Sequence, residues 1–182
     1  MKQNKKAVYL AQGAVIAALY AVLTLATWQF SSLQIQVRLS EALCILPLFT
    51  NAAVPGLYIG CLIADLLAGN VWDALFGALA TLLAAVSTYC IGRKTTGPAR
   101  WLLAPLPAVL FNVIIVPPVL YFAYGFTGFD LGGSVIEGLW PVLGLTALSV
   151  LIGQVIACCG VGIPLYLALE KIGLFKKPGP KS

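Results

Sequence analysis

The polar and charged residues of this chain fall between long apolar runs. The first run, residues 7–28, has 22 residues without a charge, about 33 Å as an α-helix and enough to cross a bilayer. Further apolar runs follow, so we interpret the first as a true transmembrane helix and not as a signal peptide. The pattern predicts six spans, at about residues 7–28, 41–52, 54–69, 71–92, 101–124 and 137–169.

Two parts of this pattern are less regular. The second segment, residues 41–52, is short for a full crossing, so we expect it to be tilted, kinked or shielded by neighbouring helices. A polar stretch, residues 29–40, precedes it, and residues 125–135 are predicted to form a loop.

Composition limits the class of protein. Of the 182 residues, 60% are hydrophobic and only 9% are charged, whereas a soluble domain carries about a quarter charged residues. The same values exclude a disordered chain. We therefore predict one all-α membrane domain over residues 1–182, a bundle of six transmembrane helices.

The residue inventory also limits the chemistry. The chain has no histidine, which excludes histidine acid–base catalysis and histidine metal sites. Its five cysteines form no CxxC pair and are interpreted as small packing residues. We expect no cofactor, no metal and no catalytic residue.

The sides on which the charges fall indicate a topology. With six spans, ten of the eleven basic residues lie on one side, which the positive-inside rule makes cytoplasmic, together with both termini. Only Arg38 lies opposite. The net charge of +5 is thus a topology signal, and nucleic-acid binding is not expected. The ten residues are Lys2, Lys5, Lys6, Arg93, Lys94, Arg100, Lys171, Lys176, Lys177 and Lys181.

Small residues predict close helix packing. Alanines recur along one face of the first helix, where another helix of this chain or of another subunit can approach closely. From this spacing alone an internal partner is favoured. Gly56 and Gly60 form a GxxxG pattern, interpreted as internal packing. The alanines are Ala7, Ala11, Ala14, Ala18 and Ala21.

Polar residues inside or next to spans mark a candidate binding site, because such groups are costly in hydrocarbon. Six of them have a structural alternative: a headgroup-level salt bridge for Arg38 and Glu41, a helix–helix hydrogen bond for the amides, an interface anchor for the tryptophans. Asp65 lies well inside the bilayer and is harder to explain as structural. Together they describe an outward-facing pocket suited to a neutral or cationic heterocycle. The candidates are Arg38, Glu41, Asp65, Trp72, Asn112, Glu137, Trp140 and Gln154.

The sequence encodes no energy source. It contains no P-loop pattern and no pair of matching halves, so a protein of this kind that concentrates a solute needs a partner. The alternatives are a stand-alone facilitator, which needs no partner, and a membrane-embedded enzyme, for which no paired catalytic groups are apparent.

Four motifs carry a family resemblance. RLSEAL at residues 38–43, LPLFT at 46–50, VPGLYIGC at 54–61 and APLPAVLFN at 104–112 resemble the QueT family. These proteins are the substrate-specificity (S) components of energy-coupling factor (ECF) transporters. The resemblance implies a six-helix bundle that binds a queuosine precursor, a 7-deazaguanine, at its outer side. It also implies docking onto a transmembrane coupling subunit that carries two ABC-type ATPases.

The resemblance also changes two residue-level interpretations. In S components an Ala-x-x-x-Ala pattern on the first helix meets the coupling subunit. Ala14 and Ala18 match it, as do the pairs Ala7/Ala11 and Ala17/Ala21, and this match reverses the preference for an internal partner. Gln154 departs from the glutamate expected in relatives, which favours a neutral queuine-like base over an aminomethyl precursor. Another S component, for a different heterocycle, is the nearest alternative.

Overall fold

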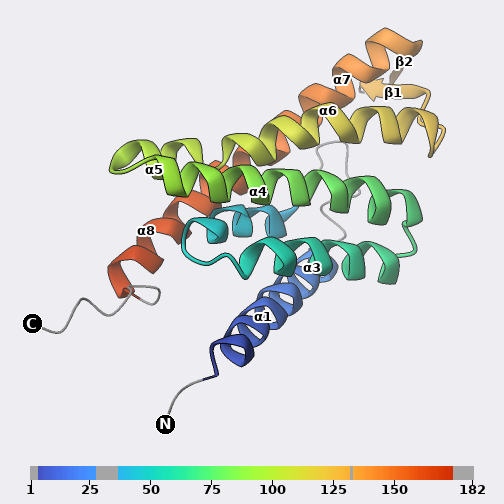
Figure 1. Ribbon diagram of the computed structural model, residues 1–182. Coiled ribbons are helices and arrows are strands. Elements are labelled where there is room, and N and C mark those ends of the chain that lie inside the picture. The colour runs from blue at the N-terminus through green and yellow to red at the C-terminus, as the bar shows by residue number, and fades with distance from the viewer. Residues whose placement is uncertain (1–3, 28–36, 132, 174–182) are drawn as a thin grey trace, which may run out of the picture.

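The computed structural model describes residues 4–27, 37–131 and 133–173. These residues form a bundle of apolar helices with one short β-hairpin (Figure 1). The elements are α1 (Lys5–Ala26), the 3-10 helix η1 (Leu39–Leu48), α3 (Ala53–Leu67), the π-helical turn η2 (Asp73–Gly77), α4 (Ala78–Lys94), α5 (Pro98–Leu103), α6 (Leu106–Phe122), β1 (Gly128–Leu131), β2 (Ser134–Glu137), α7 (Leu139–Gln154), the π-helical segment η3 (Val155–Val161) and α8 (Gly162–Ile172).

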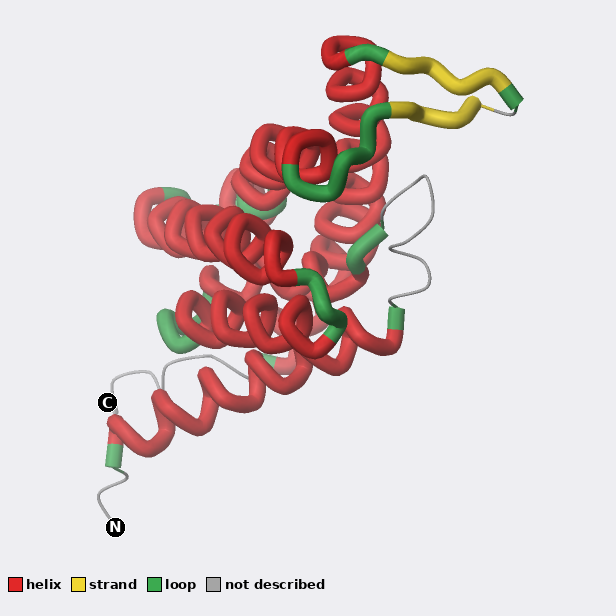
Figure 2. The backbone as a smooth tube through the Cα atoms, turned by 90° about the vertical axis from the view of Figure 1, so that its right-hand side faces the viewer, coloured by secondary structure: helices red, strands yellow, loops and turns green. Residues whose placement is uncertain are grey.

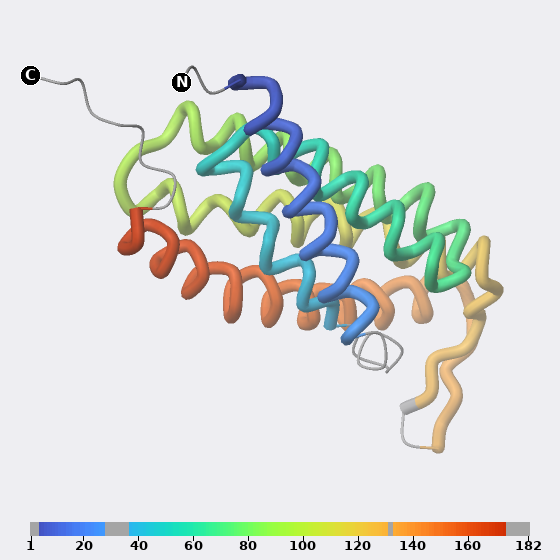
Figure 3. Tube along the Cα trace, turned by 90° about the horizontal axis from the view of Figure 1, so that it is seen from below, coloured from blue at the N-terminus to red at the C-terminus, as the bar shows by residue number. Residues whose placement is uncertain are grey.

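Six apolar helical stretches account for the six predicted spans. Four are long enough to cross a membrane: Lys5–Ala26, Asp73–Lys94, Pro98–Phe122 and Leu139–Ile172. The other two, Leu39–Leu48 and Ala53–Leu67, are shorter. The last long stretch is α7, η3 and α8 in continuous succession, drawn orange to red in Figure 3. The predicted all-α bundle of six helices is thus confirmed, with a small hairpin added.

All described basic residues except Arg38 lie at one end of the bundle. The start of α1, the α4–α5 turn and the end of α8 lie together there, and the hairpin projects from the opposite end (Figures 2 and 3). We call the first the basic end and the second the hairpin end. The residues that define the basic end are Lys5, Lys6, Arg93, Lys94, Arg100 and Lys171.

The short segment η1 lies in the middle of the bundle. Its residues Ser40 to Leu48 are all buried, and it packs against α1, α4, η3 and α8. Because neighbouring helices surround it, its length need not match the thickness of a bilayer. Of the three expectations for this span, shielding is the one that the structure shows directly.

Helices α1 and α3 approach closely through the GxxxG pattern. A Cβ atom on Gly56 would lie 2.8 Å from the Gly13 carbonyl oxygen, and one on Gly60 would lie 2.7 Å from that of Ala17. Both distances are below van der Waals contact, so only glycine permits this spacing. The predicted internal role of Gly56 and Gly60 is confirmed.

The alanines of α1 divide between two faces. Ala21 is buried, together with Ala17, whereas Ala7, Ala11, Ala14 and Ala18 are exposed. The internal partner favoured from spacing alone is therefore wrong for these four alanines within the described residues. The glycines of α3 meet the Gly13–Ala17 face instead, which leaves the alanine face open.

The segment predicted as a loop contains a β-hairpin. Strands β1 and β2 pair antiparallel, with Gly128 opposite Glu137 and Leu131 opposite Ser134. The last span consequently begins at Leu139, after Gly138 with its positive φ of 108°, and not at Glu137. Four-residue strands are too short to produce a clear alternation in the sequence.

Candidate functional site

A group of polar side chains lies inside the apolar bundle, and its members come from all six apolar stretches. We call it the polar cluster. All are buried except Arg38 and Asp73, which are partly exposed. The members are Tyr20, Thr24, Arg38, Ser40, Glu41, Cys61, Asp65, Asp73, Asn112, Gln154 and Cys158.

Arg38 joins three elements by ion pairs. It precedes η1, and its guanidinium pairs with Asp65 of α3 and, at 3.8 Å, with Asp73 of η2. The Asp65 side chain is 0% exposed, so its charge requires this compensation. Gly77 borders this ion pair, and a Cβ atom there would make ordinary van der Waals contact, 3.6 Å, with both Arg38 Nη1 and Asp65 Oδ2.

The second carboxylate oxygen of Asp65 has a partner on its own helix. The Cys61 thiol donates to Asp65 Oδ2 at 3.3 Å, and Thr81 of α4 donates to the Cys61 sulfur at 3.5 Å. Cys61 was interpreted as a packing residue, but its thiol extends the polar cluster toward α4. Asp65 is thereby held by both of its oxygens.

Glu41 lies at the centre of the polar cluster. Tyr20 of α1 donates its hydroxyl to Glu41 Oε1 at 2.5 Å, and the Asn112 side chain of α6 lies near the same carboxyl group. The Asn112 amide also donates to the Ala108 carbonyl at 2.9 Å, which fixes its orientation. The Tyr20 hydroxyl thus gives a hydrogen-bond donor to a carboxyl group that is only 2% exposed.

Gln154 lies on the other side of Glu41. The Cys158 thiol lies 3.5 Å from the Glu41 carbonyl oxygen and 3.3 Å from Gln154 Oε1, so it links the two residues. Cys158 belongs to the π-helical segment η3, which begins directly after Gln154. The extra residue in a π-helical turn shifts which side chains face the core, and such turns often occur at functional sites.

Five of the eight candidate residues meet in this cluster: Arg38, Glu41, Asp65, Asn112 and Gln154. The other three are exposed. Trp72 is 47% exposed and stacks on Phe76, with ring centroids 6.2 Å apart. Trp140 is 79% exposed at the start of α7, and Glu137 is exposed at the end of β2.

Sequence reasoning missed several members of the cluster. Thr24 donates to the Tyr20 carbonyl and lies 2.7 Å from the Ser40 hydroxyl, which links α1 to η1. Asp73 follows Asp65 across the Gly69–Asn70 turn, and a turn at this position could have indicated that the two carboxylates lie close together. Tyr20 was a weaker indication of the site, since tyrosine is common in transmembrane helices.

The electrostatics of the cluster favour hydrogen-bond donors. Among the described residues it holds three carboxyl groups, of Glu41, Asp65 and Asp73, against the single guanidinium of Arg38. Outside the spans, burial raises the pKa of the Tyr124 hydroxyl, and the neighbouring Asp73 raises it further. A ligand with N–H donors or a positive charge suits this balance better than a phosphate or a carboxylate.

Comparison with protein families identifies the chain. Residues 10–171 match the family described as QueT transporter. The chain belongs to the QueT transporter family. It is therefore a transport protein and not an enzyme, as expected, and with its four long apolar helices it is a multi-pass membrane protein. No curated protein and no solved structure matches it significantly.

Family membership changes how the cluster is interpreted. In a QueT transporter, buried polar groups inside a membrane bundle are candidates for substrate contacts. No group of residues able to hold a metal ion is found in the described part of the chain. The polar cluster is the candidate substrate site of this transporter.

Proposed function

We propose that this QueT-family protein is the substrate-binding S component of an ECF-type ABC importer for a queuosine precursor. It captures a 7-deazaguanine at the hairpin end, which we assign to the outer side of the bacterial plasma membrane, and delivers it after docking on an ATP-driven coupling module. The basic end is then cytoplasmic. The observation that carries the proposal is the buried, carboxylate-rich polar cluster in a member of a transporter family.

The chemistry of a 7-deazaguanine fits this cluster. Its pyrimidine edge offers two neighbouring N–H donors, which one carboxylate can accept together, and a carbonyl that an amide or guanidinium can bind. Asp65 already accepts from Arg38 and Cys61, so we assign the donor edge of the base to Glu41. Asn112, beside Glu41, then donates to the carbonyl.

Gln154 bears on which part of the precursor is recognised. Its neutral amide lies next to Glu41 through Cys158 and adds no charge for an aminomethyl group. We therefore propose that the site recognises the 7-deazaguanine ring, which queuine and 7-aminomethyl-7-deazaguanine share, and not the basic amine that both of them carry. Trp72 and Trp140 are assigned to the membrane interface, where tryptophan is enriched.

The proposed docking surface is the exposed alanine face of α1. Ala14 and Ala18 lie one helical turn apart on this face and are not covered by any other described part of the chain. Small side chains let two helices approach closely in a bilayer. The proposed partner is the ECF transmembrane coupling subunit with its two ABC-type ATPases, which would supply the missing energy source.

Calorimetric titration of the purified protein in detergent tests the ligand assignment. We expect saturable binding of queuine and of 7-aminomethyl-7-deazaguanine with similar affinity, and no binding of thiamine. Glu41→Gln should lower the affinity for queuine, whereas Glu137→Gln, which changes an exposed carboxylate, should not. Failure of every deazaguanine to bind would exclude the proposed substrate class.

Co-purification from the native host tests the transport mechanism separately. Tagged protein should retain a coupling subunit and two ATPases. A stand-alone facilitator retains neither and transports queuine in reconstituted vesicles without ATP. That second result would contradict the importer proposal while leaving the ligand assignment intact.

A further inference from the structure

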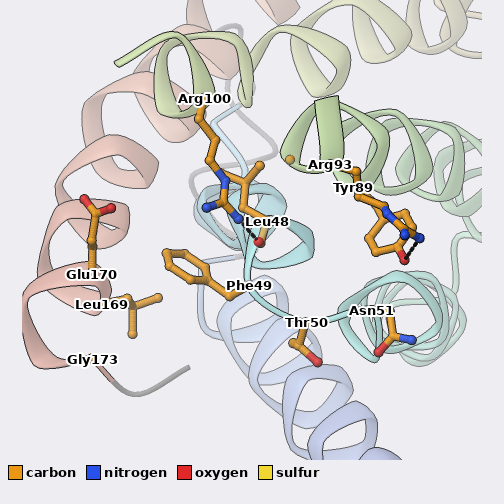
Figure 4. Close-up of a pocket in the computed structure, with 11 residues that line it drawn as sticks. Leu48, Phe49, Thr50, Asn51, Tyr89, Arg93, Arg100, Leu169, Glu170 and Gly173 are labelled. Carbon is orange, nitrogen blue, oxygen red and sulfur yellow. Dashed lines mark hydrogen bonds between the residues drawn. The ribbon is translucent and has the colours of Figure 1, made fainter. Parts of the chain in front are cut away.

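A pocket lies at the basic end, away from the polar cluster. It has a volume of about 740 Å³ and lies between the end of η1, the last turns of α4 and α8, and Arg100 of α5 (Figure 4). It has no role in the function proposed above.

Two guanidinium groups line this pocket, and neither has a carboxylate partner among the described residues. Arg93 donates to the Tyr89 hydroxyl at 3.1 Å and lies over the same ring, 5.7 Å from its centroid. Arg100 donates to the Leu48 carbonyl, but its buried Nε has no hydrogen-bond partner among the described residues. Both ion pairs in the described part of the chain belong to Arg38 instead.

The pocket carries a net positive charge. Glu170 is its one carboxylate among the lining residues, and Glu170 Oε1 accepts the Tyr166 hydroxyl at 3.1 Å. One carboxylate therefore faces two guanidiniums. An unpaired donor on Arg100 and a surplus positive charge are the features that bind an oxyanion, and arginine's fork of N–H groups matches phosphate geometry.

Apolar residues form another wall of the same pocket. Leu48, Phe49 and Leu169 line it, and the Phe49 ring packs against Tyr166 with centroids 5.2 Å apart. Apolar side chains make no favourable contact with a free phosphate ion. A phospholipid, in contrast, has an acyl chain close to its phosphate, and this chain can contact the apolar wall. The spans Asp73–Lys94 and Leu139–Ile172 both end here, at the depth of lipid headgroups.

We propose that this pocket binds the phosphate of an anionic phospholipid. Arg93 and Arg100 hold the phosphate oxygens, and Leu48, Phe49 and Leu169 contact the upper part of an acyl chain. The bound lipid links η1, α4, α5 and α8 at the basic end. This differs from general attraction of lysines to an anionic membrane, because it is one saturable site with two defined donors.

Native mass spectrometry of the protein released from nanodiscs tests the proposal. The wild type should retain one phosphatidylglycerol molecule and exchange it poorly for zwitterionic phosphatidylcholine. Arg93→Gln with Arg100→Gln should lower phosphatidylglycerol retention about tenfold or more. The control is Lys94→Gln with Lys171→Gln, which removes the same charge from exposed residues outside the pocket lining and should retain the lipid.

Two further arms keep the result interpretable. Arg93→Gln alone changes an exposed side chain that bonds only within α4, so it should fold and still reduce retention. Inorganic phosphate, added to protein in phosphatidylcholine nanodiscs, should bind much more weakly than phosphatidylglycerol. Equal lipid retention in the double variant and the lysine control overturns the proposal, and so does tight binding of phosphate alone.

Discussion

The ion pair between Arg38 and Asp65 should contribute strongly to stability, and Asp65→Asn tests this. The substitution keeps the shape of a side chain that is 0% exposed but removes its charge. Removing one partner of a buried ion pair costs about 3–5 kcal/mol. Because Asp73 remains 3.8 Å from Arg38, we expect the lower end of this range, about 3 kcal/mol.

The expected loss corresponds to a measurable change in melting temperature. For a chain of this size, 1 kcal/mol shifts the melting temperature by about 2–4 °C, so Asp65→Asn should melt about 6–12 °C below the wild type. Scanning fluorimetry of the purified protein in detergent, followed through its tryptophans, measures this. Glu137→Gln is the matched control, since it neutralises an exposed carboxylate and should change the melting temperature by less than about 2 °C.

A double variant separates the ion pair from other causes. Arg38→Gln combined with Asp65→Asn removes both charges, so neither is left buried without compensation. It should therefore recover part of the loss seen for Asp65→Asn alone. A double variant that melts at or below the temperature of Asp65→Asn would refute the reasoning, because the loss would then come from other contacts of Asp65.

Three more outcomes follow from packing and exposure. Gly60→Ala should destabilise the protein by about 1–3 kcal/mol in the same melting assay, because its Cβ would meet the Ala17 carbonyl, whereas Gly144→Ala, whose Cβ enters open space, should not. Ala14→Leu and Ala18→Leu should leave queuine binding to the purified protein intact but block cellular uptake, and uptake that survives both would place the docking face elsewhere. Trp140→Ala should leave the queuine affinity measured by calorimetry unchanged, since the side chain is 79% exposed. A tenfold loss of queuine affinity would show that Trp140 belongs to the binding site.

Hydropathy was sufficient to predict the bundle but not its irregular parts. A transmembrane span satisfies its backbone internally, so a long apolar run implies a helix. The same reasoning does not reveal η1, whose short length is compatible with tilt, kink or shielding until its neighbours are known. Nor does it reveal the hairpin, which begins within the predicted loop 125–135, because such short strands gain order only by pairing.

The candidate site was partly predictable because polar residues are rare in this chain. Arg38, Glu41, Asp65, Asn112 and Gln154 stood out against apolar surroundings, and all five lie in the cluster. Their partners did not stand out, because the pairing depends on distant segments. The Cys158 thiol, for example, meets the Glu41 carbonyl across 117 positions of sequence.

The glycines of α3 connect the packing of the bundle to the geometry of the candidate site. A Cβ on Gly60 would lie 2.8 Å from the Tyr20 Cβ, so the absence of that atom sets how near Tyr20 sits to the bundle interior. The Tyr20 hydroxyl in turn reaches Glu41 Oε1 at 2.5 Å. A methyl group at position 60 that pushes α1 outward must lengthen this hydrogen bond as well. Gly60→Ala should then lower ligand affinity together with stability, whereas a substitution on the exposed face of α1 affects neither.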